Sequence, residues 1–140
     1  MSEFRNLVDA HFGFLVEEFG FMPAVTNRER VHYSSPTCVV GIDLEHGISN
    51  AWISLRPPPN AAHSASALSV LLVANCRGFK GDSGPKYRDL DTRMIEEIEL
   101  FARLLRDYCG DLLSGDFARW PEIVTCVRAL PMPPGLEKFR

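Results

Sequence analysis

The sequence predicts a single α+β domain in which a three-stranded antiparallel meander packs against helices. Three observations indicate this: apolar residues with helical spacing near the start, a β-rich stretch with short connections, and helical spacing again in the last third. A length of 140 residues suits one domain with a substantial core. We expect the domain to span residues 1–130, and the proline-rich residues 131–140 to form a loose C-terminal tail.

The first element is an amphipathic helix over residues 3–19. Ser2 is a suitable N-cap for it, and Gly20 is a suitable residue to end it. One face of the helix is apolar and should be buried. Its members are Phe4, Leu7, Val8, Phe12, Leu15 and Phe19.

The β-rich stretch predicts three strands, over residues 30–34, 37–44 and 51–56. Ser35-Pro36 separates the first two, and Glu45-His46-Gly47 is a turn signal before the third. Such short connections favour antiparallel neighbours. The prolines at 57–59 should end the sheet, because proline cannot donate a hydrogen bond to a neighbouring strand.

The second half predicts three helices and one loop. Residues 67–76 are almost entirely apolar; a buried strand is an alternative there, but their Ala and Leu content favours a short buried helix. Residues 77–90 form a glycine- and charge-rich loop. A long helix should begin near residue 91 or 92 and reach Leu113, with an irregularity at Gly110. After a stop at Gly115, Asp116 should cap a last helix to about Val127.

Charge and cysteine content exclude several classes of protein. The chain has 15 basic and 18 acidic residues, and neither half has a basic excess, so we expect no nucleic-acid partner. No apolar run is long enough to cross a membrane, and the start shows no secretory signal. The four cysteines show no metal-binding spacing, so we expect reduced thiols, no disulfide, no metal or other cofactor, and a cytoplasmic location.

Two short segments imitate catalytic or phosphate-binding motifs. Gly81-Asp82-Ser83-Gly84-Pro85 and the segment around His63 look like the nucleophile and histidine segments of trypsin-like serine proteases, but the spacing and the chain length do not fit that fold. The same loop lacks the phosphate-binding G-x-x-x-x-G-K-[ST] pattern. We therefore expect no enzyme. A small enzyme or ligand-binding domain that uses the 77–90 loop, with His63 or Asp82 in a pocket, remains the alternative.

Side chains suited to protein recognition occur in three parts of the sequence. Tryptophan and arginine are favoured anchors of protein interfaces. Acidic side chains on a helix can steer a basic partner toward the protein. For Asp116, Arg119 and Trp120, the third group, a purely structural role as a turn and helix cap is the alternative. The candidate binding residues are Trp52, Tyr87, Arg88, Glu96, Glu97, Glu99, Asp116, Arg119 and Trp120.

The order of these elements resembles a loose group of small bacterial α+β proteins. The residue patterns that carry the resemblance are Glu18-Phe19-Gly20-Phe21 and the segment 112–120, Leu-Leu-Ser-Gly-Asp-Phe-Ala-Arg-Trp. Some proteins of this kind are immunity proteins of polymorphic toxin systems. The resemblance implies a cytoplasmic protein with a protein partner, and it carries over no catalytic residue.

The sequence thus favours a non-catalytic protein-binding module, with an immunity-type inhibitor of a bacterial toxin as its specific form. If the toxin cleaves nucleic acid, acidic side chains of this chain should meet a basic active site. A homodimeric protein that pairs through the edge of its sheet is the third reading.

Overall fold

The computed structural model describes residues 3–27, 29–45, 48–55, 67–81 and 90–130. The predicted tail at 131–140 lies outside this part. The elements in chain order are α1 (Glu3–Glu17), β1 (Met22–Asn27), β2 (Arg30–Ser34), β3 (Cys38–Glu45), β4 (Ile48–Leu55), β5 (Leu68–Ser69), α2 (Val70–Cys76), α3 (Leu90–Tyr108), α4 (Gly110–Leu113) and α5 (Trp120–Ala129).

The strands form one antiparallel sheet in the order β1-β2-β3-β4-β5. The α+β class is confirmed, and β2, β3 and β4 are the three predicted strands. The predicted sheet of three strands is too small, because β1 and β5 add a strand at each edge. Pro23 and Ala24 concealed β1, since both residue types are depleted in strands. The apolar segment predicted as one helix begins instead with the two residues of β5.

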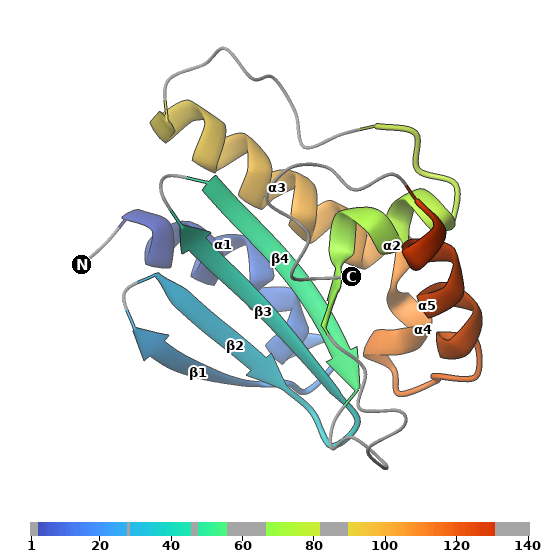
Figure 1. The fold of residues 1–140 in the computed structure, drawn as a ribbon. Helices are drawn as coiled ribbons and strands as arrows, with labels where there is room; N and C mark the ends of the chain where they lie inside the picture. The colour runs from blue at the N-terminus through green and yellow to red at the C-terminus, as the bar shows by residue number, and fades with distance from the viewer. Residues whose placement is uncertain (1–2, 28, 46–47, 56–66, 82–89, 131–140) are drawn as a thin grey trace.

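One face of the sheet carries the core. Alternate residues of the central strands, such as Val31, Val40 and Ile53, are fully buried. Helices α1 and α3 lie behind the sheet in Figure 1, while α2, α4 and α5 gather beside its β4–β5 edge. No described helix packs on the opposite face. None of the described helices is long and apolar enough to cross a lipid bilayer.

Glycines end or interrupt the helices near the predicted positions. Gly20 has φ of 72°, and the N–H of Phe21 donates to the carbonyl of Leu15 at 2.9 Å, which closes α1. The predicted irregularity at Gly110 is confirmed, because α3 stops at Tyr108 and α4 begins at Gly110.

The start of the last helix differs from the prediction. Asp116 does not cap α5; its carboxylate accepts the N–H of Ala118 at 3.0 Å and so closes a local turn. The N-cap position belongs to Arg119, and Pro121 occupies the first turn. Proline is well suited to that position because its missing N–H would have no partner inside the helix.

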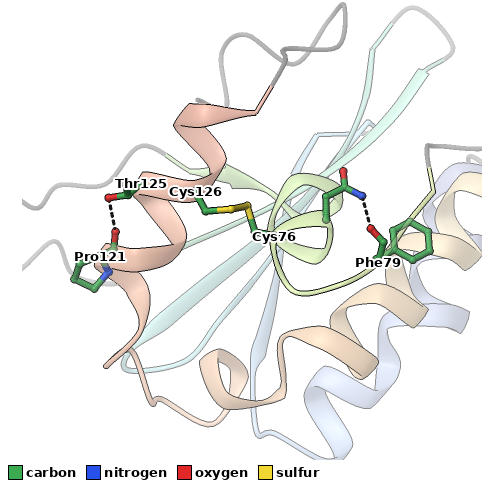
Figure 2. The surroundings of a disulfide bond; sticks show 6 residues. Cys76, Phe79, Pro121, Thr125 and Cys126 are labelled. Atoms are coloured by element: carbon green, nitrogen blue, oxygen red, sulfur yellow. Dashed lines mark hydrogen bonds between the residues drawn. A yellow bond between two sulfur atoms is a disulfide. The ribbon is translucent and has the colours of Figure 1, made fainter.

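A disulfide joins Cys76 at the end of α2 to Cys126 in α5. Figure 2 shows the two side chains meeting between these helices. The expectation of four reduced thiols is therefore wrong for this pair. A separation of 50 residues gave no spacing signal, and apolar neighbours made both cysteines resemble buried free thiols. Cys38 and Cys109 do remain free, and burial raises the pKa of each thiol to about 12.

A second link fixes the end of α2 to the junction of α3 and α4. The Arg77 guanidinium donates to both carboxylate oxygens of Asp111, at 2.6 and 2.8 Å, and to the carbonyl of Tyr108 at 2.7 Å. Its hydrogen bonds hold the pKa of the Asp111 carboxyl below its usual value. The helices beside the β4–β5 edge are thus tied together by an ion pair and by a covalent bond.

Candidate binding site on the open face of the sheet

The strand register places a row of functional side chains on the sheet face that no described helix covers. His32 of β2 pairs with Gly41 of β3, and Gly41 pairs with Trp52 of β4. Two residues along, Arg30 pairs with Asp43. Paired residues of an antiparallel sheet share a face, as do residues two apart on one strand. We call these five residues the Trp52 cluster.

Trp52 is held in one position by its neighbours. Its indole lies over Gly41 and occupies the space that a side chain at position 41 would need. The ring of His32 meets it edge to face, with centroids 5.0 Å apart. The indole Nε1 donates to Asp43 Oδ2 at 3.1 Å. Trp52 itself is half-buried, so part of this fixed aromatic ring remains open to a partner.

Asp43 is a buried carboxylate with one oxygen unused. The residue is only 8% exposed. Within the described part of the chain, its Oδ1 is buried and accepts no hydrogen bond. The Nε of Arg30 lies 3.9 Å from Oδ1, beyond hydrogen-bond distance, and the Arg30 side chain is 54% exposed. Such a carboxylate can accept a further donor, and a positively charged one most favourably.

The margin of the cluster mixes small polar side chains with one exposed apolar side chain. Ser34 and Ser54 flank Val39 in the next row of the same face, and all three are half-buried. Met22 pairs with Ser34 and is 70% exposed. Met22 lies on β1, three strands away from Trp52 on the same face. An exposed methionine at this edge is suited to contact with another protein, because its flexible thioether adapts to varied surfaces.

The groups of the cluster are suited to non-covalent contacts. It offers an aromatic ring, a carboxylate oxygen and an exposed guanidinium, which are groups for stacking and ion pairing. Among the residues that the structure describes, no group of three or more His, Cys, Asp or Glu side chains could hold a metal ion.

Of the predicted binding residues, Trp52 is the one that the structure places in this cluster. Tyr87 and Arg88 lie outside the described residues. So do His63, Asp82 and Ser83, on which the ligand-binding alternative depends. The described start of the 77–90 loop is tied to α2, because the Asn75 amide donates to the carbonyls of Phe79 and Gly81.

The three glutamates of α3 do not form a common acidic face. Glu97 is 1% exposed and packs under the sheet, where its Oε1 accepts the N–H of Ser49 at 3.5 Å. Its Oε2 lies 3.6 Å from Arg93 Nε. Glu99 is exposed and lies 3.8 Å from His11 of α1, whereas Glu96 is half-buried. The interpretation of Glu97 as a solvent-facing binding residue is therefore wrong, because helical rotation turns it toward β4.

Replacement of Glu97 with glutamine should raise stability at neutral pH. Burial raises the pKa of this carboxyl above 4.5 despite the nearby Arg93. The stabilising contribution of the protonated form is complete below 4.5 and is lost as pH rises through the raised pKa of the folded state. Glutamine is neutral at every pH and keeps an acceptor for Ser49. Urea unfolding should show a gain of about 1 kcal/mol or less at neutral pH, shrinking below 4.5. A loss at neutral pH would contradict this.

The third group of predicted residues is divided between structural and exposed positions. Trp120 is only 5% exposed and packs against Phe117, with ring centroids 5.2 Å apart, which favours a structural role. Asp116 closes the turn described above. Arg119 is exposed and lies 3.7 Å from Glu122 of the same helix. Asp116 and Arg119 belong to the turn before α5 and Trp120 is the first residue of α5, so none of the three lies on the sheet face that carries Trp52.

Sequence reasoning missed His32, Asp43 and Arg30 as neighbours of Trp52. One signal was available: Gly41 inside a strand indicates close approach of another group. An acidic residue within an otherwise apolar strand, as Asp43 is, was a second. Their convergence depends on the register between three strands, which no short motif encodes.

Comparison of the chain with protein-family models, with curated proteins and with solved structures gave no match. The resemblance to immunity proteins therefore stays a prediction.

Proposed function

We propose that this chain is a non-catalytic protein-binding module that docks a basic partner on the open face of its sheet. The observation that carries the proposal is Trp52, half-buried and fixed over Gly41 by its hydrogen bond to Asp43. Rigid tryptophans at the centre of a surface are frequent anchors of protein interfaces. The unused carboxylate oxygen and the net charge of −3 favour a partner with basic side chains.

An immunity-type inhibitor is the specific form that the sequence resemblance supports. A toxin that cleaves nucleic acid would present a basic surface, which complements the cluster. Dimerisation through a sheet edge is less favoured, because β1 carries Pro23 and β5 has two residues. We keep the cytoplasm as the proposed location. Stable disulfides are typical of oxidising compartments, so an intact bond between Cys76 and Cys126 in cells would argue against a cytoplasmic location.

A matched pair of variants tests the docking face. Ser54→Arg places a long cation on the open face, whereas Ser114→Arg places the same side chain at an exposed position after α4. The tagged natural protein and both variants are used to capture partners from the native lysate at low salt. We expect Ser54→Arg to weaken the partner's binding at least tenfold, about 1.4 kcal/mol, and Ser114→Arg to leave it unchanged.

Two results would contradict the proposal. One is that the partner is lost with Ser114→Arg but kept with Ser54→Arg, which would place the interface near α5. The other is that no stoichiometric partner is captured at all, which would favour the ligand-binding alternative. Circular dichroism of both variants controls for loss of folding.

A further inference from the structure

We infer that Trp52 and Asp43 of the Trp52 cluster form a receptor for a single basic side chain of the partner, with arginine the best fit, and that Arg30 competes for Asp43 in the free protein. The inference deepens the proposed function and rests on it. It names the chemical group that is recognised and assigns Arg30 the role of an internal competitor.

The carboxylate of Asp43 supplies the charge. Its Oδ2 is already used by Trp52 Nε1 at 3.1 Å, so its orientation is fixed. Its Oδ1 is buried without a hydrogen bond in the described part of the chain. An acceptor that is buried and unused is costly, and a charged donor recovers more of that cost than a neutral one.

The indole of Trp52 supplies the second contact. Among aromatic side chains, tryptophan attracts cations best. Gly41 supports the ring and His32 meets its edge, so the ring does not have to be ordered on binding. Arginine suits the pair better than lysine, because a planar guanidinium can stack on an aromatic ring while it donates to a carboxylate.

Arg30 is placed to compete for the same carboxylate. Its Nε is 3.9 Å from Asp43 Oδ1, close enough for attraction but too far for a hydrogen bond. More than half of its side chain is exposed, so it can move into solvent without leaving a cavity. A partner's guanidinium that donates directly to Oδ1 would replace this weak contact with a stronger one.

The two tryptophans of the chain allow a direct test by NMR. The indole N–H of Trp52 reports on the cluster, and that of the buried Trp120 serves as an internal control. The probe is N-acetyl-arginine amide, titrated at constant ionic strength into nitrogen-15-labelled full chain. The matched control is the citrulline derivative, which has nearly the same shape but no charge.

We expect a saturable shift of the Trp52 signal with the arginine probe in the millimolar range, and none with the citrulline probe or at Trp120. Asp43→Asn keeps an acceptor for Trp52 Nε1 and should weaken binding at least tenfold. Arg30→Gln removes the competitor and should tighten binding several-fold. Equal response to both probes, or no saturable shift, would overturn the inference. Unchanged or weaker binding by Arg30→Gln would overturn the role of Arg30.

The result is separable from that of the capture experiment. If Ser54→Arg loses the partner but Trp52 does not respond to the arginine probe, the face is a docking surface of different chemistry, and the proposed function stands while the inference fails. If Trp52 responds but Ser54→Arg keeps the partner, the receptor exists and the proposed docking face is wrong.

Discussion

Reduction of the Cys76–Cys126 disulfide should lower the free energy of unfolding by about 4 kcal/mol. The bond joins residues 50 positions apart, and it restricts the unfolded chain far more than the folded one. In the chain-entropy description, a loop of this length accounts for the full amount. The effect is large because a typical domain is stable by only about 5–15 kcal/mol.

Urea unfolding with and without a dithiol reductant measures this difference. The variant with Cys76→Ser and Cys126→Ser should match the reduced natural protein within about 1 kcal/mol and should not respond to the reductant. Thiol titration of the unreduced, denatured chain should find two reactive groups, Cys38 and Cys109. A count of four would show that the bond does not form.

Replacement of Gly41 with alanine should cost about 2 kcal/mol. The added methyl group would overlap the indole of Trp52, which must then leave its place over the strand. Movement of the ring breaks the hydrogen bond to Asp43 and leaves that buried carboxylate without its partner. The unfolding midpoint should therefore fall, although alanine is otherwise preferred to glycine within a strand.

A double-mutant cycle separates the cost of overlap with the Trp52 indole from the intrinsic effect of replacing glycine with alanine in a strand. With Trp52→Ala as the background, the space over position 41 is empty, and Gly41→Ala should be neutral or stabilising by about 0.5–1 kcal/mol. The change of sign is the expected signature of direct contact. If Gly41→Ala costs the same in both backgrounds, the indole does not rest on Gly41. Asp43→Asn is a useful third variant, because it removes the charge but keeps an oxygen that can accept the hydrogen bond from Trp52 Nε1.

The parts of the fold that were predicted correctly are those with local signals. The periodicity of α1 and α3, the alternation in β4 and the helix-ending glycines each depend on residues a few positions apart. Strand β1 was missed because Pro23 and Ala24 are poor strand formers, and it is held as a strand by pairing with β2. The disulfide was missed for the same kind of reason, since its two cysteines approach only through the packing of α2 on α5.

Of the residues that form the candidate site, the sequence predicted one, Trp52. Trp52 stood out by its residue type, but its partners follow from the registers of β2 with β3 and of β3 with β4. A shift of one residue in either register would turn Asp43 or His32 to the other face. On α3 the sequence led to a wrong inclusion: Glu97 is predicted to face solvent, but the helix turns it toward β4. Charge alone does not show which side of a helix faces the core.

The covalent link between α2 and α5 also gives the chain two different lengths under tension. A protein pulled from its two ends extends by roughly 3.5 Å for each residue released. The residues between Cys76 and Cys126, which include all of α3 and α4, cannot contribute while the bond is intact, and this conceals about 170 Å of contour length. In a single-molecule force experiment, the appearance of that extra extension would mark the moment at which a reductant cuts the bond.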